Sequence, residues 1–308
     1  MNLDTVLYKG GNDKPAVVFI HGLGMDSDIW VNPSQSRILG GMFPLRILLN
    51  KRLPEEQPDN LQTLFDDLRL KGYTVITWSQ KRPAGPIDFA VSELSEIVKI
   101  ANKMTKAGVI LIGHSRGGLI GRKYLLRKDR SIKALITIST PHKGSSVARA
   151  ANYLSPVVSI LNPLFPIGDK GTRSFAIKRI FEFLSSRALK ELLPESRFLK
   201  SIKDGPLDWV HYVSVGGTNP TLFNLYNFSF PDIFEKVIPE NLYPEEMKKG
   251  RGDGLVSAES SKIPWSNEHY DFELNHAEIL FAEGVRGTLL KAIERLRSFS
   301  EMKYNLSV

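Results

Sequence analysis

A serine held between glycines at residues 113–117, GHSRG, is the group in this sequence best placed to do chemistry. The apolar run VILI at 109–112 precedes it, and a segment with helical periodicity, from Gly117 to Arg127, follows. This is the strand, turn and helix context of the G-x-S-x-G motif, whose sharp turn presents the serine hydroxyl above the strand ends. We therefore predict that Ser115 is a nucleophile; the alternative is a glycine-rich turn that only connects the two elements.

A nucleophilic serine needs a base that accepts its proton and a third group that orients the base. His276 follows a segment, 269–275, whose apolar and charged residues alternate as in a half-buried strand. The carboxyl end of that strand would lie at the sheet edge that carries Ser115, so we predict that His276 is the base. The alternative is a histidine that caps the helix beginning at Ala277. The other histidines are less suitably placed: His21, His114, His142, His211 and His269.

The acid of such a triad is expected in a loop that follows an earlier strand at the same edge. Asp253 lies between two glycines in GRGDGLVS, 250–257, after the strand-like WVHYVSV, 209–215. One loop and one strand then separate it from His276. We predict that Asp253 is the acid; the alternative is an aspartate–glycine turn without a catalytic role. Other aspartates fit this placement less well: Asp204, Asp208, Asp232 and Asp271.

A second glycine-rich turn predicts donors for an oxyanion hole. In AVVFIHGLG, 16–24, an apolar run ends in glycines, and there the N–H of Leu23 can point into the site. The other donor is expected to be the N–H of Arg116, next to the nucleophile. Two such donors would stabilise the negative charge that develops on a carbonyl oxygen. A phosphate-binding turn is disfavoured, because the chain has neither G-x-G-x-x-G nor a P-loop lysine.

Strands and helices are predicted to alternate around these residues. This alternation indicates an α/β fold, with a mainly parallel sheet covered by helices on both faces. Ligands of such sheets bind at the carboxyl ends of the strands. The predicted strands are 16–20, 73–78, 109–112, 132–138, 209–215 and 269–275, and the predicted helices are 61–72, 91–104, 117–127 and 279–296.

Two segments interrupt this alternation. Residues 144–206 contain no predicted strand, carry prolines in an apolar run and include an amphipathic helix near 177–188. We interpret 144–206 as a mostly helical cap or lid inserted into a core formed by 1–143 and 207–308. Residues 31–60 are more apolar than a connecting loop should be and are a second candidate for a segment that closes over the site.

The composition of the chain excludes several kinds of cofactor and partner. The chain has 308 residues, 42% hydrophobic and 24% charged, which fits one large globular domain with an insertion, or two small domains. The absence of cysteine excludes disulfides, thiolate catalysis and cysteine-ligated zinc, and no H-E-x-x-H motif is present, so we expect neither a metal nor a cofactor. The net charge of +8 comes from short, scattered basic runs without interleaved aromatics. We therefore expect no nucleic-acid partner. The basic residues form either an ordinary solvated surface, which we favour, or a surface that tolerates anionic interfaces.

No apolar stretch reaches the roughly 18 residues of a membrane span, and residues 1–11 lack the basic-then-apolar order of a signal peptide. We expect a soluble protein that is cytoplasmic by default and secreted only if a leader has been removed. The oligomeric state stays open.

The segments HGLG, GHSRGG, ISTPHKGS, GDGLVS and LNH, in this order, resemble the α/β-hydrolase superfamily, and within it bacterial-type lipases and related acyl-ester hydrolases. The resemblance covers most of the chain apart from 144–206, where these enzymes carry a cap. It implies the chain order serine, acid, histidine for Ser115, Asp253 and His276, and we expect Thr140, Pro141 and His142 to belong to the scaffold. The length of 31–60 departs from the family pattern.

Together these features predict a serine hydrolase that cleaves carboxylic esters with medium or long acyl chains through an acyl-enzyme. The apolar cap would line the acyl pocket, and the enzyme would contact lipid interfaces transiently. An amidase or acyltransferase would use the same residues. A phospholipase-type or lipid-anchor deacylase is favoured by the positive charge but disfavoured because we expect no membrane anchor. A non-catalytic binding module is a remote alternative, because such a module would be expected to have lost a member of the triad.

Overall fold

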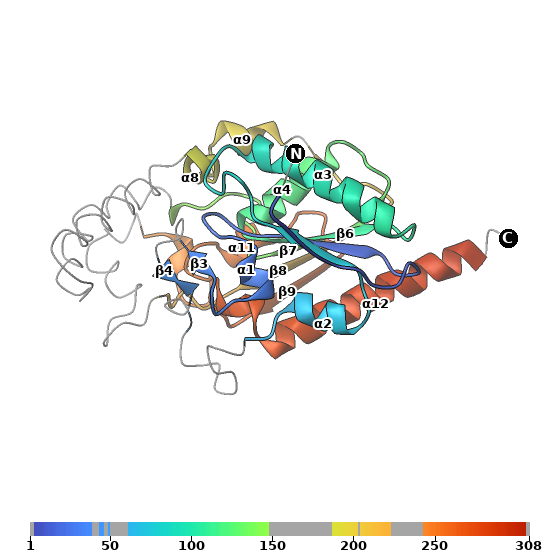
Figure 1. The fold of residues 1–308 in the computed structure, drawn as a ribbon. Coiled ribbons are helices and arrows are strands. Elements are labelled where there is room, and N and C mark those ends of the chain that lie inside the picture. The colour runs from blue at the N-terminus through green and yellow to red at the C-terminus, as the bar shows by residue number, and fades with distance from the viewer. Residues whose placement is uncertain are drawn as a thin grey trace.

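The computed structural model describes residues 3–38, 43–45, 49, 61–147, 187–202, 204–222 and 243–305. Its centre is a seven-stranded sheet (Figure 1). All neighbouring strands run parallel except the edge strand β1, which pairs antiparallel with β5. The predicted mainly parallel sheet is therefore confirmed. In spatial order the strands are β1 (Thr5–Tyr8), β5 (Val75–Trp78), β2 (Ala16–Ile20), β6 (Val109–His114), β7 (Ile132–Ile138), β8 (His211–Gly217) and β9 (Glu268–Phe272).

Helices cover both faces of this sheet, as predicted (Figure 1). One face carries α3 (Ile87–Met104), α4 (Arg116–Leu125), α8 (Arg187–Glu191) and α9 (Arg197–Ser201). The other carries α1 (Asp28–Val31), α2 (Leu64–Leu70) and α12 (Glu283–Asn305). Shorter elements are β3 (Arg37–Ile38), β4 (Phe43–Pro44), α11 (Ala258–Ser261) and the 3₁₀ turns η4 (Glu245–Met247) and η5 (Glu278–Leu280). Within the described ranges, none of the helices is both long and apolar enough to cross a membrane.

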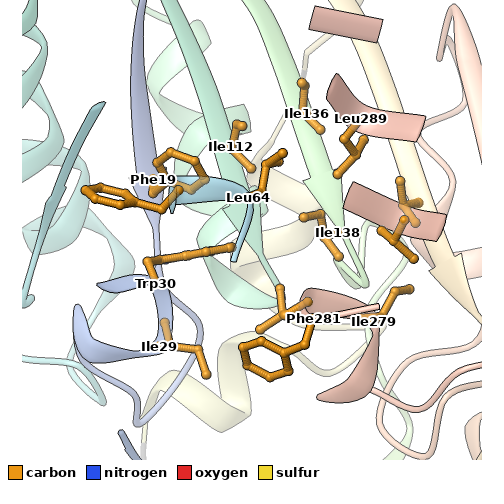
Figure 2. Close-up of a cluster of buried hydrophobic side chains, with 14 of the residues drawn as sticks. Phe19, Ile29, Trp30, Leu64, Ile112, Ile136, Ile138, Ile279, Phe281 and Leu289 are labelled. Carbon is orange, nitrogen blue, oxygen red and sulfur yellow. The ribbon is translucent and has the colours of Figure 1, made fainter. Parts of the chain in front are cut away.

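The strand β2 shows how one apolar run builds two cores. Val17 and Phe19 belong to the cluster under α1, α2 and α12, whereas Val18 and its alternate neighbours belong to the cluster under α3 and α4. This follows from the two-residue period of a strand, which sends successive side chains to opposite faces. Phe19 packs its ring against Trp30, with ring centroids 5.0 Å apart (Figure 2). Both cores therefore meet at the strand that leads into the predicted oxyanion turn.

Several element boundaries differ from those predicted. Helix α2 begins at Leu64 because the hydroxyl of Thr63 accepts a hydrogen bond from the N–H of Asp66 and so caps the helix. Strand β6 continues two residues past the predicted end, to His114. The predicted strand at 209–215 is shifted to 211–217, and the predicted terminal helix at 279–296 is split into η5 and α12. The edge strand β1 was not predicted, because its four residues have no clear alternation of apolar and polar types.

The two segments that interrupt the alternation are described only in part. Of the predicted insertion, the structure describes 144–147, 187–202 and 204–206, with α8 and α9; the amphipathic helix predicted near 177–188 lies mostly outside the described residues. Within 31–60, the strands β3 and β4 form an antiparallel pair, and Ile38 and Leu45 are buried in the same core as Phe19. The division into a core and a cap stays a prediction.

Candidate active site

The turn between β6 and α4 holds Ser115 in an uncommon backbone conformation. Its φ is +52° and its ψ is −126°. A non-glycine residue in such a conformation costs about 1–3 kcal/mol and persists only where its surroundings impose it. Here the N–H of Ser115 donates to the carbonyl of Ile138 at 2.8 Å, and its carbonyl accepts from the N–H of Gly118 at 3.1 Å. The turn is therefore held by the neighbouring strand β7 and by the first turn of α4.

Glycine is required on both sides of this serine. A Cβ added at Gly113 would lie 2.4 Å from the backbone nitrogen of Gly118, and one added at Gly117 would lie 2.2 Å from the carbonyl oxygen of Ile20. Both distances are far inside van der Waals contact with backbone atoms that cannot move alone. The close approach of the surrounding backbone therefore requires glycine at both positions of the G-x-S-x-G motif.

The structure brings Asp253 and His276 into direct contact. Nδ1 of His276 lies 2.8 Å from Oδ2 of Asp253, and the two side chains are 2% and 0% exposed. The other carboxylate oxygen, Oδ1, accepts from the backbone N–H groups of Leu255 and Val256 at 3.0 and 2.7 Å. A carboxylate at Nδ1 places the imidazole proton on that nitrogen and leaves Nε2 as the basic nitrogen. The pair therefore has the geometry of a base and the acid that orients it.

Two residues that the sequence analysis missed hold His276 in this position. Oδ1 of Asn275 accepts from the N–H groups of Ala277 and Glu278, each at 2.9 Å, and Oε2 of Glu278 accepts from the N–H of Asn275 at 3.3 Å. This reciprocal arrangement is a capping box, for which the spacing N-x-x-E was the available signal. The residue that caps the turn after β9 is therefore Asn275, whereas the alternative interpretation assigned that role to His276.

The turn at 22–24 lies directly against Ser115. A Cβ added at Gly22 would be 3.1 Å from Cβ of Ser115. Gly24 has a φ of +66°, and its N–H donates to the carbonyl of Pro83 at 3.4 Å. Leu23 stands between these two glycines, so its amide is near the proposed nucleophile. The other predicted donor, the N–H of Arg116, belongs to the first turn of α4, where amides have no acceptor within the helix.

His21 supports this turn and was not predicted to do so. Its Nε2 accepts from the N–H of Gln80 at 3.0 Å, so its Nδ1 carries the proton and donates to the carbonyl of Gly22 at 3.0 Å. Burial, with a smaller contribution from the charge on Arg116, lowers the pKa of His21 to about 4. The imidazole is therefore neutral at physiological pH and acts as a fixed hydrogen-bonding link between β5 and the turn.

The side chain of Arg116 connects the same region to the end of the predicted insertion. Its Nη1 donates to the carbonyl of Pro83 at 3.3 Å, and its Nη2 donates to the carbonyl of Gly85 and lies 3.8 Å from Oε2 of Glu191 in α8. Burial lowers the pKa of this guanidinium to about 10, so it stays charged at neutral pH. Glu191 also accepts from the N–H of Ile87 at 3.1 Å. The carbonyl of Pro83 thus receives hydrogen bonds from both Gly24 and Arg116.

The predicted site residues form two groups at the carboxyl edge of the sheet. Ser115, Arg116 and the turn at Leu23 form one group, and Asp253 and His276 form the other. The hydroxyl of Ser115 makes no hydrogen bond with another residue in the part of the chain that the structure describes. His114, the residue before Ser115, links the two groups: its Nε2 lies 2.9 Å from the carbonyl oxygen of His276.

The remaining histidines have other partners. His142 is bonded to Thr137, His211 to Glu268, and His269 to both Ser214 and Asp271. Among the described residues, no group of three or more histidine, aspartate or glutamate side chains is arranged to hold a metal ion.

Comparison with known proteins shows the family to which this chain is similar. A family model described as palmitoyl protein thioesterase matches residues 16–204. Triacylglycerol lipase 2 of Saccharomyces cerevisiae is 30% identical over 182 residues, which are 49% of this chain and 52% of that protein. Homoserine O-acetyltransferase of Thermus thermophilus is 29% identical over 79 residues, 26% of this chain and 21% of that protein. The chain thus spans about half of the first relative and about a fifth of the second.

Solved structures share the architecture at low sequence identity. The mature form of lipase BlEst2 from Bacillus licheniformis has a TM-score of 0.57 and 17% identity, with 94% of this chain and 98% of that chain covered. The metagenomic carboxyl esterase MGS0156 has a TM-score of 0.54 and 14% identity, with 95% and 78% covered. These similarities concern the fold alone, and the expected α/β-hydrolase fold is confirmed.

Proposed function

The chain belongs to the palmitoyl protein thioesterase family, and we propose that it hydrolyses carboxylic esters or thioesters with medium or long acyl chains through an acyl-enzyme on Ser115. The apolar composition of 144–206 supports acyl groups longer than acetyl, because a cap of this kind can line a pocket for hydrocarbon. The name of the yeast relative, a triacylglycerol lipase, favours the same class of acyl group.

The observation that carries the proposal is the buried 2.8 Å contact between His276 and Asp253 at the sheet edge that also holds Ser115. Ser115 keeps a positive φ in a turn whose flanking glycines have no room for a side chain. A connecting turn without chemistry would have no need for a strained serine. A buried histidine oriented by a carboxylate, at the same sheet edge as such a serine, fits general-base catalysis.

The proposed reaction has two acyl-transfer steps. Nε2 of His276 takes the proton of the Ser115 hydroxyl as Oγ attacks the carbonyl carbon. The N–H groups of Leu23 and Arg116 stabilise the oxyanion. The bond to the leaving alcohol or thiol then breaks, and His276 returns the proton to that group, which leaves an ester on Ser115. Water, deprotonated by His276, attacks this ester, and the carboxylic acid and free enzyme are released.

Thioesters form a second substrate class, which the family description favours. A thiol leaving group has a pKa of about 8.5, far below that of an alcohol, so it departs with less help from a proton donor. The same two-step reaction therefore applies to esters and thioesters. Measuring kcat/KM for an ester and a thioester with the same acyl chain determines which class the enzyme prefers.

The function is tested with p-nitrophenyl esters and acyl thioesters of acetyl, butyryl, octanoyl and palmitoyl groups. We expect a preference for chains longer than acetyl and a loss of several orders of magnitude in kcat for Ser115→Ala. Unchanged turnover in Ser115→Ala would end the proposal. A flat chain-length profile would remove only the long-chain preference. Acyl transfer to added alcohols, or cleavage of matched amides, would favour an acyltransferase or an amidase instead.

The net charge of +8 supports transient contact with anionic lipid interfaces, including those that carry phospholipid substrates. Faster turnover on vesicles with anionic lipids than on neutral vesicles, with the difference abolished by salt, would support this contact.

A further inference from the structure

His114, the residue before Ser115, is buried completely and donates a hydrogen bond to the second group of site residues. Its Nε2 lies 2.9 Å from the carbonyl oxygen of His276. A carbonyl oxygen can only accept, so Nε2 of His114 carries the proton. Burial, with a further contribution from the His276 ring, holds the pKa of His114 well below its usual range. His114 is therefore a neutral donor with one fixed tautomer.

The imidazole rings of His114 and His276 are also in contact. Their centroids are 4.8 Å apart and their planes are inclined by 48°. In the proposed reaction, the ring of His276 becomes positively charged. A neutral aromatic ring within about 6 Å tolerates this cation, whereas a charged one would repel it. The neutral state of His114 therefore matches the charge that His276 takes on during the reaction.

The other ring nitrogen of His114 points to the oxyanion turn. A Cβ added at Gly22 would lie 3.2 Å from Nδ1 of His114 and 3.1 Å from Cβ of Ser115. This Nδ1 has no hydrogen-bond partner among the described residues. His114 thus fills the space between the turn at Gly22 and the loop of His276, two segments that are far apart in sequence.

We propose that His114 is a positioning residue that fixes the main chain of His276, while Asp253 fixes its ring, so that the base is held beside Ser115. The backbone N–H of His276 already donates to the carbonyl of Asp253 at 3.1 Å, within the second group; the bond from His114 ties the carbonyl of His276 to the strand that leads into Ser115. This inference rests on the proposed roles of Ser115 and His276. A displacement of about 1 Å in a reacting group can reduce turnover about 100-fold.

The test separates the donor from the ring. His114→Gln keeps an N–H donor at nearly the reach of Nε2, whereas His114→Phe keeps a ring but has no donor. We expect His114→Phe to lower kcat by about 10- to 100-fold with little change in KM, and His114→Gln to restore kcat to within a few-fold of the wild type. His114→Asn, whose amide is too short to reach the carbonyl, should resemble His114→Phe; this comparison decides the matter if the phenylalanine variant does not fold.

His142 supplies a matched control. It is likewise buried, its pKa is held well below its usual range by burial, its Nε2 bonds to Oγ1 of Thr137 at 3.1 Å, and its Nδ1 has no partner among the described residues. It makes no contact with His276 in that part of the chain. We expect His142→Phe and His142→Gln to alter the thermal midpoint without the donor-dependent change in kcat.

Equal losses of kcat in His114→Phe and His142→Phe would overturn the proposal, as would a His114→Gln variant no better than His114→Asn. Failure of the proposed function is recognised separately. If Ser115→Ala keeps full turnover, the catalytic assignment itself is wrong. If Ser115→Ala is inactive but His114→Phe retains the wild-type kcat, only the positioning role of His114 is wrong.

Discussion

Asp253 and His276 meet through a 2.8 Å hydrogen bond from Nδ1 to Oδ2, in a site from which solvent is almost fully excluded. Both oxygens of the carboxylate are occupied, one by the imidazole and one by two backbone amides. The two backbone amides therefore fix the carboxylate independently of His276, and the carboxylate in turn favours one tautomer of the histidine.

Asp253→Asn should lower kcat by two to four orders of magnitude while the fold is retained. The amide keeps the size of the carboxylate, but it can favour the wrong tautomer and cannot stabilise the imidazolium. The measurement is kcat on a p-nitrophenyl ester, with the thermal midpoint followed in parallel. Asp271→Asn is the matched control, because Asp271 also contacts a histidine, His269 at 3.2 Å, but is 46% exposed. Equal effects in both variants would contradict the role proposed for Asp253.

Gly117→Ala should destabilise the protein by more than about 3 kcal/mol, because the new Cβ would lie 2.2 Å from the carbonyl oxygen of Ile20. In α12, a Cβ added at Gly287 would meet nothing within 4 Å, so Gly287→Ala should instead raise the free energy of unfolding by about 0.5–1 kcal/mol. Urea unfolding of both variants measures whether the free energy of unfolding falls in Gly117→Ala and rises in Gly287→Ala. A Gly117→Ala protein as stable as the wild type would mean that the turn can relax.

Glu191→Gln should reduce both stability and turnover. The variant removes the carboxylate charge that lies 3.8 Å from the buried guanidinium of Arg116, at a cost of roughly 1–3 kcal/mol. Because the same guanidinium binds the carbonyl of Pro83, which also holds Gly24, the oxyanion turn should shift and kcat should fall. A boronic acid that mimics the tetrahedral intermediate should bind more weakly in proportion to the loss of kcat/KM.

Asp204→Asn is the control for that experiment. Asp204 pairs with Arg122, which lies further along α4 and makes no contact with the turn at 22–24 among the described residues. This variant should lose stability while keeping its kcat and its affinity for the boronic acid. If the two variants lose turnover equally, the ion pair at Arg116 has no special connection to the oxyanion turn.

Stability should decrease as the pH falls from about 6.5 to about 4. The folded chain holds the pKa of His21 at about 4, whereas the unfolded chain has the ordinary value, so the unfolded state binds more protons in this range. His21 alone then contributes a loss of roughly 3 kcal/mol, and the lowered pKa values of His114 and His142 act in the same direction. Urea unfolding at several pH values, with His21→Gln for comparison, checks this: the variant should lose less stability on acidification.

The nucleophile turn could be predicted because every part of its signal is local. An apolar run, two glycines and a helical period lie within about twenty residues of Ser115. The sheet followed from the same kind of pattern, with errors of a few residues at element ends, where side-chain caps such as that of Thr63 decide the boundary. Asp253 and His276 could be placed at the correct edge because parallel strands present all their carboxyl ends there.

The residues that support the site could not be predicted in this way. His21 and Gln80 meet because they follow the neighbouring strands β2 and β5, and Arg116 meets Glu191, which lies far along the chain within the predicted insertion. No local period encodes such contacts. Asn275 differs from these residues because its role has a local signal, the capping-box spacing with Glu278. The sequence analysis considered a capping role only for the histidine between them.

The positive φ of Ser115 implies a trade-off between thermal stability and activity. Glycine adopts its φ of +52° without penalty, so Ser115→Gly should melt at a higher temperature than Ser115→Ala, although neither variant could catalyse the reaction. The difference in melting temperature between these two inactive variants measures the backbone strain that a Cβ atom causes at this position. Glycine at this position would therefore give the more stable protein, and the serine side chain lowers the stability of the fold in exchange for its proposed role in the reaction.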